Sequence, residues 1–150
     1  MRKEIILIFL LILILFSLFF IMNNGVNQQK QVTVGGIYLD LPEGYDVGNP
    51  NKLGHINITN GKNTIFLANY NDGNISKYVN QYKSEIAKNN QSVSSVNLTI
   101  NNMSVYESIN LKTDAHHYWF VENGTVYTIY NWDKNSNIEK IVYNMIESIK

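Results

Sequence analysis

Histidines and a nearby aspartate are the residues that could hold a metal ion. His116 and His117 are adjacent in a predicted strand, so their side chains point to opposite faces and cannot bind one ion together. Asp114 shares a face with His116, and His55 could approach from another strand. The sequence therefore offers His55, Asp114 and His116 as a candidate metal site. The alternative is ordinary polarity at a strand edge, with one histidine packed against aromatic rings.

Aromatic residues are concentrated in two predicted strands near the end of the sequence. They are Tyr118, Trp119, Phe120, Tyr127, Tyr130 and Trp132. Aromatic side chains supply large contact areas and could line a ligand cleft. We select Tyr118, Tyr130 and Trp132 as candidate ligand-binding residues, and we expect Trp132, at a strand end, to be the most exposed. Packing within the core is the alternative for the whole group.

The sequence carries no signature of an enzyme. It has no cysteine, which excludes cysteine nucleophiles, thiolate metal sites and disulfides. None of its ten serines lies in a G-x-S-x-G motif. Gly35-Gly36 lacks the lysine and the helix that follow the glycines of a phosphate-binding loop. We therefore predict a protein that is not an enzyme and that uses no cofactor.

Six N-x-S/T sequences could accept glycosylation on an external domain. They begin at Asn57, Asn74, Asn90, Asn97, Asn102 and Asn123. Asn57 and Asn97 also fall on the polar phase of their predicted strands. Because 23 of the 150 residues are asparagine, the alternative explanation is a bias in composition.

The first part of the sequence is a continuous apolar segment, residues 5–22, interrupted only by Ser17. A helix of this length spans roughly 27 Å, close to the hydrocarbon thickness of a bilayer. No A-x-A-like cleavage site follows, because the next residues are Asn23, Asn24 and Gly25. We predict an uncleaved transmembrane signal anchor. A cleaved signal peptide is the alternative.

The charges around this segment predict its orientation. Arg2 and Lys3 precede it, and basic residues favour the cytoplasmic side, so residues 1–4 should be cytoplasmic. Residues 23–31 then form a polar tether, and residues 32–150 form an extracytoplasmic domain. After residue 4 there are 10 basic and 11 acidic residues, a net charge of −1. Such a domain has no electrostatic basis for binding nucleic acid.

Alternating apolar residues predict the strands of this domain. The first strand covers residues 32–41 and has a bulge at Gly35-Gly36. Turn residues predict hairpins around Asn60-Gly61, Asn101-Asn102 and Asn123-Gly124. The last two strands are apolar or aromatic on both faces, so we expect them to lie in the interior of a sheet that is covered on both sides.

Helical spacing of apolar residues predicts helices over residues 75–86 and 138–149. Ser136 and Glu139 form a capping box that should open the second helix. The predicted fold class is α+β: a mainly antiparallel sheet of about six to seven strands with a helix on each face, in addition to the transmembrane helix.

This order of elements resembles the PsbP family of small extracytoplasmic domains. The resemblance covers residues 36–150 and includes the turn at residues 42–45, the early hairpin at Asn60-Gly61, the aromatic strands at residues 118–132 and the ending Ile146-Glu147-Ser148-Ile149. It implies an α-β-α sandwich and an accessory, assembly or lipoprotein-like role.

We therefore expect a membrane-anchored extracytoplasmic accessory or protein-interaction module, with the membrane and an envelope protein as partners. The alternative is a small-ligand or metal-binding domain that uses the late aromatic hairpin. An interaction module should expose a patch at the sheet edge. A ligand-binding domain should have a pocket with convergent polar groups. A hydrolase would need a histidine within hydrogen-bond reach of a serine or a carboxylate.

Overall fold

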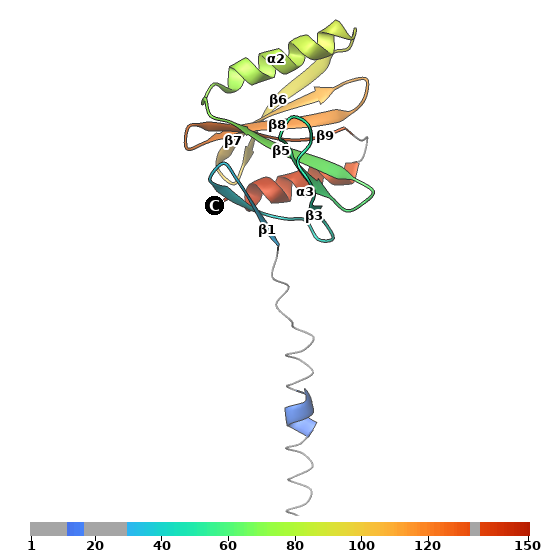
Figure 1. The fold of residues 1–150 in the computed structure, drawn as a ribbon, viewed down its shortest axis with the longest axis vertical. Helices are drawn as coiled ribbons and strands as arrows, with labels where there is room; N and C mark the ends of the chain where they lie inside the picture. The colour runs from blue at the N-terminus through green and yellow to red at the C-terminus, as the bar shows by residue number, and fades with distance from the viewer. Residues whose placement is uncertain (1–11, 17–29, 133–135) are drawn as a thin grey trace, which may run out of the picture.

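The computed structural model describes residues 12–16, 30–132 and 136–150 (Figure 1). Residues 12–16 form a short helical segment. In these described ranges, no helix is both long enough and apolar enough to cross a membrane. Most of the predicted anchor, residues 5–22, lies outside the described residues. The anchor, the residues before it and its orientation therefore remain predictions.

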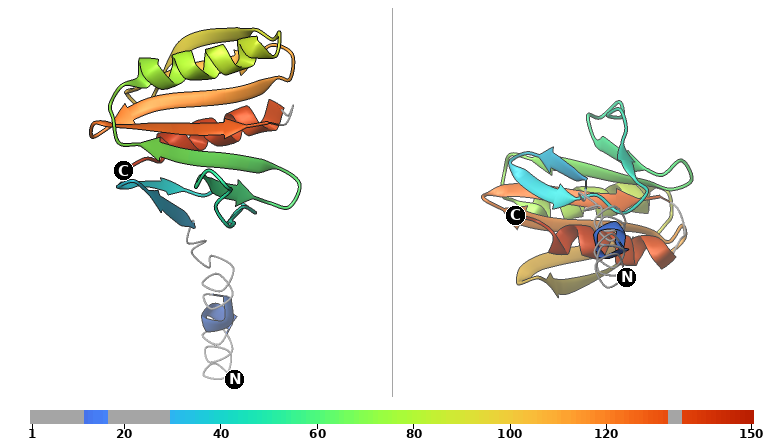
Figure 2. Two further views of the ribbon diagram at one scale, coloured as in Figure 1. Left: turned by 45° about the horizontal axis from the view of Figure 1, so that its top comes forward. Right: turned by 90° about the horizontal axis from the view of Figure 1, so that it is seen from below.

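Seven antiparallel strands form the main sheet in the order β3-β4-β5-β9-β8-β7-β6. The strands are β3 (Asp46–Val47), β4 (Ile56–Thr59), β5 (Thr64–Tyr70), β6 (Val93–Ile100), β7 (Met103–Asn110), β8 (Ala115–Glu122) and β9 (Thr125–Asn131). The helices α2 (Ile75–Lys88) and α3 (Ser136–Glu147) cover opposite faces (Figures 1 and 2). The predicted antiparallel sheet with a helix on each face is confirmed, and the aromatic strands β8 and β9 lie in its interior.

Two of the predicted hairpins have two-residue turns. Asn101 and Asn102 join β6 to β7 with φ of 47° and 63°, and Asn123 and Gly124 join β8 to β9 with φ of 49° and 74°. Positive φ at both central residues matches the right-handed twist of the flanking strands, and asparagine and glycine adopt it at low cost. These turns fix the register of four of the seven strands.

The hairpin at Asn60-Gly61 is confirmed, but its loop is longer than a two-residue turn. Thr59 pairs with Thr64, so four residues connect β4 to β5. The Asn60 carboxamide oxygen accepts hydrogen bonds from the backbone N–H groups of residues 62 and 63. This asparagine therefore stabilises the loop through its side chain as well as its backbone.

The prediction of one bulged strand over residues 32–41 is wrong. β1 (Gln31–Val34) and β2 (Ile37–Asp40) form a separate antiparallel hairpin. Gly35 and Gly36 are its turn, with φ of 56° and 98°. A glycine bulge and a two-residue turn of this kind both need positive φ and both preserve the alternation of apolar residues, so the sequence pattern fits either one.

Hydrogen bonds from its turn and from β2 fix this hairpin to the rest of the domain. The hydroxyl of Tyr127 donates a hydrogen bond of 2.7 Å to the carbonyl of Gly35. A Cβ atom on Gly35 would lie 2.7 Å from the side chain of Asn69, and the φ of 56° is also one that glycine adopts at low cost, so both features favour glycine here. In β2, Tyr38 and Lys150 exchange two backbone hydrogen bonds, and the N–H of Asp40, at the open end, donates a hydrogen bond of 2.8 Å to the hydroxyl of Ser148.

Two clusters of buried apolar side chains lie on the two faces of the sheet. The larger cluster fills the space between the sheet, the β1-β2 hairpin and α3, and includes Phe120, Ile129 and Val142, all fully buried. The smaller cluster lies under α2 and consists of Val79, Tyr82, Trp119 and Val126 with partly buried neighbours. The α2 face therefore has the thinner core.

The start of α2 agrees with the sequence. The side chain of Asn74 accepts a hydrogen bond of 3.2 Å from the backbone N–H of Lys77, which is one of the donors left unpaired at a helix N-terminus. Asn89 follows the last turn as the C-cap residue. The predicted capping box of α3 involves the side chain of Ser136, which lies outside the described residues.

Candidate functional site

The adjacent histidines of β8 lie on opposite faces of the sheet, as predicted. His116 is on the α3 face, where its Nδ1 lies 2.7 Å from a carboxylate oxygen of Glu107 and 3.2 Å from the hydroxyl of Tyr118. His117 is on the α2 face, where its ring packs against Tyr82 with a centroid separation of 4.0 Å. One strand thus presents two imidazoles to two different environments.

The His116 environment is an acidic hydrogen-bond network. The hydrogen bond to the buried Glu107 carboxylate raises the pKa of His116, and the charges of Glu139 and Asp114 add to this effect against a smaller opposing effect of burial. A hydrolase would need a histidine within hydrogen-bond reach of a serine or a carboxylate, and His116 lies within such reach of the Glu107 carboxylate. In the described part of the chain, however, no hydrogen bond joins a serine hydroxyl to a histidine.

The three candidate metal ligands do not come together. Asp114 lies 3.8 Å from Nε2 of His116, but His55 is on the other side of the sheet. There its Nδ1 is 2.7 Å from the hydroxyl of Tyr130. Within the described ranges, no group of three or more histidine, cysteine or acidic residues could hold a metal ion. The sequence did not show the face on which His55 would lie.

The three candidate ligand-binding residues are also divided between the faces. Tyr118 is fully buried on the α3 face, with its ring against Tyr143. Tyr130 and Trp132 lie together on the α2 face, with ring centroids 5.4 Å apart. Trp132 is 53% exposed, the most exposed aromatic residue of the two strands, as expected. Of the three candidate ligand-binding residues, only Tyr130 and Trp132 could therefore share a site, and that site lies on the α2 face.

An open cavity of about 430 Å³ lies on this face, between α2, the sheet and the loop before β4. We call it the aromatic groove. Its lining residues are Leu53, His55, Tyr70, Tyr78, Gln81, Tyr82, Glu85, His117, Trp119, Thr128, Tyr130 and Trp132. The residues from α2 recur at helical spacing, and those from β8 and β9 alternate along their strands, so each element contributes one face.

His117 lies at the floor of the aromatic groove. Its ring is parallel to that of Tyr130 at a centroid separation of 4.6 Å, and the ring of Trp132 is nearly perpendicular to it at a centroid separation of 5.5 Å. The side chain is 5% exposed, and neither ring nitrogen has a hydrogen-bond partner. Burial lowers the pKa of His117 to about 3, so the imidazole is neutral near pH 7. A neutral imidazole has one donor and one acceptor nitrogen.

Three more polar atoms in the lining are buried without a partner. They are the hydroxyl of Tyr82, the Nε1 of Trp119 and the Oγ1 of Thr128. Trp119 and Thr128 are cross-strand neighbours, as are His117 and Tyr130. A native fold contains few buried polar atoms without partners, and several in one place require an explanation. Other such atoms lie elsewhere in the domain, among them the hydroxyls of Tyr45 and Ser108, but these three and His117 line one open cavity.

Comparison with known proteins identifies the architecture. No protein-family model matches the sequence, and no curated protein matches it. The structure is similar to the solution structure of cyanobacterial PsbP (CyanoP) from Synechocystis sp. PCC 6803, with a TM-score of 0.55 and 7% identity over 85% of this chain and 94% of that one. The domain has a PsbP-like fold.

A second similar structure comes from Bacteroides thetaiotaomicron VPI-5482. The TM-score is 0.56 and the identity 11%, over 82% of this chain. The PsbP-like chain spans about half the length of that protein, 48%. Both similarities concern the fold, and they confirm the architecture that the resemblance implied.

Sequence reasoning missed most of the residues that line the groove. Within the PsbP-like domain, His117, Tyr82 and Thr128 had no motif around them. One signal was available in the two aromatic strands. Side chains alternate between the two faces along a strand, so Trp119 and Tyr130 could be placed on the face opposite Tyr118. The side chains that α2 contributes to the groove could be identified only from the tertiary structure.

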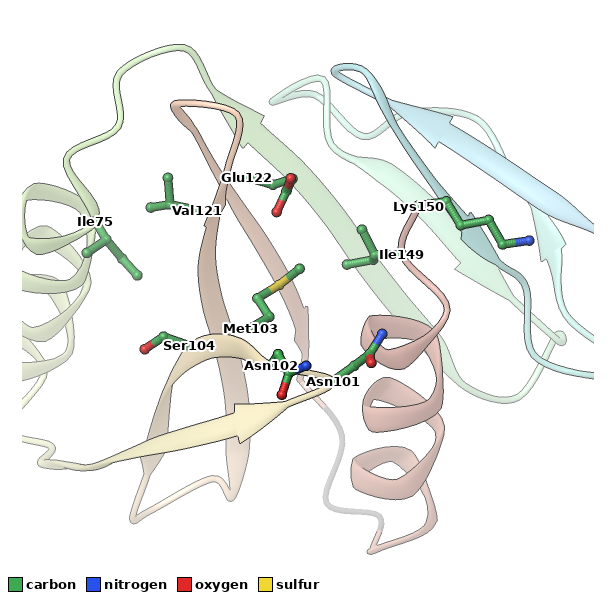
Figure 3. Close-up of a pocket in the computed structure, with 9 residues that line it drawn as sticks. All are labelled: Ile75, Asn101, Asn102, Met103, Ser104, Val121, Glu122, Ile149 and Lys150. Carbon is green, nitrogen blue, oxygen red and sulfur yellow. The ribbon is translucent and has the colours of Figure 1, made fainter.

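Another cavity, of about 500 Å³, lies at the turn end of the PsbP-like domain (Figure 3). Its side chains come from separate elements: Ile75 at the start of α2, Met103 after the β6-β7 turn, Val121 and Glu122 at the end of β8, and Ile149 after α3. None of its described lining residues carries a buried polar atom without a partner. We therefore place the candidate site in the aromatic groove.

The six sequons differ in their surroundings. Five of the asparagines are exposed: Asn74, Asn90, Asn97, Asn102 and Asn123. Asn57, on β4, is half-buried, and its carboxamide oxygen is buried without a hydrogen-bond partner. Exposure is a requirement for modification, so glycosylation of the other five remains a prediction.

Proposed function

We propose that this protein is a binding module that holds a small, planar, uncharged molecule in the aromatic groove. The observation that carries the proposal is His117, a buried side chain whose two ring nitrogens lack hydrogen-bond partners beside an open cavity. Leaving such a group unpaired costs roughly 1–3 kcal/mol. A ligand that supplies the missing partner would recover part of this free energy.

The size and lining of the groove favour a flat ligand. Its volume of about 430 Å³ lies within the range of small-molecule sites, about 300–1,000 Å³. Tyr70 and Tyr78 stack at 4.1 Å along one side, and Tyr130 and Trp132 lie on another. Aromatic faces stack in offset geometry on other planar rings. A monocyclic or bicyclic ring therefore suits the cavity better than a flexible chain.

The polar groups favour an uncharged ligand with acceptor atoms. Glu85 is the one acidic residue in the lining, and no lysine or arginine lines the groove. The Nε1–H of Trp119 can only donate, and burial raises the pKa of Tyr82 to about 12, so its hydroxyl stays protonated. A carbonyl or ring nitrogen would accept from these groups. Because the Tyr82 hydroxyl and the Trp119 Nε1–H are shielded from solvent, a ligand reaches them only when side chains of the lining move.

A titration with three bicyclic probes, followed by the backbone amide resonances of the isotope-labelled chain in detergent micelles, tests the proposal. Quinazolin-4-one is uncharged and has acceptor atoms, naphthalene has the same shape without polar atoms, and N-methylquinolinium is a cation. We expect quinazolin-4-one to bind most tightly and to shift resonances of Tyr82, His117 and Thr128. Tighter binding of the cation would instead identify an aromatic cage for organic cations.

His117→Phe supplies the decisive variant, because it keeps a ring and removes both nitrogens. Loss of one good hydrogen bond should weaken quinazolin-4-one binding roughly tenfold, while naphthalene binding should stay within about twofold. His116→Gln is the matched control on the other face and should change neither affinity. Equal affinity of all three probes, or no shift around the groove, would contradict the proposal.

We also propose that the module is held at the outer face of the membrane by residues 5–22. Arg2 and Lys3 before the segment support this orientation. The described residues within it, 12–16, are helical, and each exposes more than half of a large apolar side chain. A continuous exposed apolar surface of this kind is typical of membrane contact.

Protease protection on intact cells, with blotting for the full-length mass, tests this anchor. We expect the protein to have its full-length mass before protease is added, and we expect protease added outside the cells to digest the domain. Protection until the membrane is broken would show that the orientation is wrong, and a smaller mature mass would show a cleaved signal peptide. Either result leaves the test of the groove unaffected.

A further inference from the structure

The two edges of the main sheet differ in length. β3, at one edge, has two residues, whereas β6, at the other, has eight and is the outermost strand beyond β7 (Figure 1). All eight residues of β6 pair with β7 in continuous register, so the strand has no bulge. No described strand pairs with its outer side. A long regular edge leaves a row of backbone donors and acceptors available to another strand.

Soluble proteins usually protect such edges with charged residues, proline or bulges. The sequence of β6 is VSSVNLTI, which has no charge, no proline and no glycine. Lysine and glutamate also keep identical edges apart, because like charges would face each other in a symmetric pair. β6 lacks this protection against a second copy of itself. A strand specific for a different chain would be expected to carry charges or other selective features.

The register to β7 shows which backbone groups of β6 point outward. Ile100 and Met103 close a two-residue hairpin turn, so this pair exchanges hydrogen bonds, as do the alternate pairs beyond it. The backbone groups of residues 93, 95, 97 and 99 then point away from β7. In an antiparallel pair, two opposite residues either both form hydrogen bonds to the other strand or both do not. In a symmetric pair one residue must therefore lie opposite its own copy, and the two-fold axis lies between these two copies.

Val96 is the exposed large apolar side chain of this strand, 43% exposed. We propose that β6 pairs with β6 of a second copy, antiparallel, about a two-fold axis midway between the two copies of Val96. The two Val96 side chains then face each other. Ser95 lies opposite Asn97 of the copy, and Val93 lies opposite Thr99. This arrangement pairs seven residues, removes Val96 from water and joins two seven-stranded sheets into one.

Edge pairing alone buries less than the roughly 800 Å² per partner of a standard interface, so we expect weak association in solution. Confinement of both copies to one membrane raises their effective concentration. This membrane effect rests on the proposed anchor, but the pairing geometry does not. The pairing is also independent of the aromatic groove, which lies on the α2 face.

Because the chain has no cysteine, Val96→Cys introduces a unique thiol that tests the axis. In a non-hydrogen-bonded antiparallel pair the opposed Cα atoms are about 4.5 Å apart, within the range that a disulfide spans. Asn97→Cys is the neighbouring control, whose equivalent thiol in the copy is displaced by two residues and out of reach. Leu111→Cys, 63% exposed in the β7-β8 loop, reports random collisions.

The full-length variants are reconstituted in vesicles of phosphatidylcholine and phosphatidylglycerol and treated with copper phenanthroline, which takes two electrons from each pair of thiols. We expect Val96→Cys to form dimers at least tenfold faster than either control. Equal rates for the three variants, or faster cross-linking of Asn97→Cys, would overturn the proposed axis. Failure of the protein to float with the vesicles would contradict the anchor instead, and the same rates measured in micelles would then decide the pairing.

Discussion

The two faces of the sheet treat the same residue type in opposite ways. On the α3 face, His116 is hydrogen-bonded to a buried carboxylate, which raises its pKa. On the α2 face, its neighbour His117 has no hydrogen-bond partner, and burial lowers the pKa of His117 to about 3. His116 thus lies in a network of paired polar groups. His117 lies among buried polar atoms that lack hydrogen-bond partners beside an open cavity, which is the contrast on which the proposed binding function rests.

The largest difference between the faces should appear on truncation of an aromatic side chain. Phe120, fully buried on the α3 face, lies in the larger core, and Phe120→Ala should lower the free energy of unfolding by roughly 3–5 kcal/mol. Trp132→Ala, at the exposed rim of the groove, should cost less than about 0.5 kcal/mol. Urea denaturation monitored by circular dichroism measures both. Similar losses would mean that the groove rim also supports the fold.

Glu107→Gln tests the paired histidine. Removing the charged partner of His116 should cost roughly 1.5–3 kcal/mol near pH 6. The raised pKa of His116 contributes stability that is fully present below its unfolded pKa of about 6.5 and lost as pH rises through the folded pKa. The deficit of the variant should therefore shrink above pH 6.5. A deficit that stays constant with pH would show that His116 is not protonated in the native state.

His117→Phe tests the unpaired histidine, and the expected pH dependence has the opposite sign. Because the folded pKa, about 3, lies below the unfolded value, the unfolded state binds the proton first, and stability is lost as pH falls below about 6.5. The native protein should lose about 1 kcal/mol from this group between pH 6.5 and roughly pH 5.5. His117→Phe should abolish this loss, and His116→Gln should not. Unfolding measured at both pH values distinguishes the variants.

Thr128→Val should give the smallest effect and a favourable one. The variant keeps the shape of the side chain and removes a buried hydroxyl without a partner, so we expect a gain of about 0.5–1 kcal/mol. The contrasting substitution is Thr59→Val. The Thr59 hydroxyl donates a hydrogen bond to the carbonyl of Asn63 and accepts one from the N–H of Gly61, so the loss of this hydroxyl should lower the free energy of unfolding by about 1 kcal/mol. A loss of stability in Thr128→Val would indicate that bound water pairs the hydroxyl.

Local chemistry determined which parts of the fold could be predicted. The turns at Asn101-Asn102 and Asn123-Gly124 were found because few residues adopt positive φ. The interior strands were found because their residues are apolar on both faces. Gly35-Gly36 was assigned wrongly because two local structures share one residue pattern.

The candidate site was less predictable because its residues are joined by long-range pairing. The aromatic groove depends on β5 lying next to β9, with Phe66 opposite Tyr130, and no turn fixes that register. The face of His55 follows from the same pairing, so the sequence could not separate it from His116. Alternation within β8 did place His116 and His117 on opposite faces, because that relation is local.

The β1-β2 hairpin has a mechanical consequence. The chain enters the domain at Lys30, whose carbonyl accepts a hydrogen bond from the N–H of Leu41, where β2 ends. Tension arriving from residues 1–29 would therefore act first on the end of the hairpin where Lys30 and Leu41 meet, and then on one residue pair after another toward the turn at Gly35-Gly36. Unzipping of this kind needs less force than shearing several pairs at once. The buried side chains of Val32 and Val34 would leave the larger core as β1 separates, and the seven-stranded sheet with its groove would carry the load only after that step.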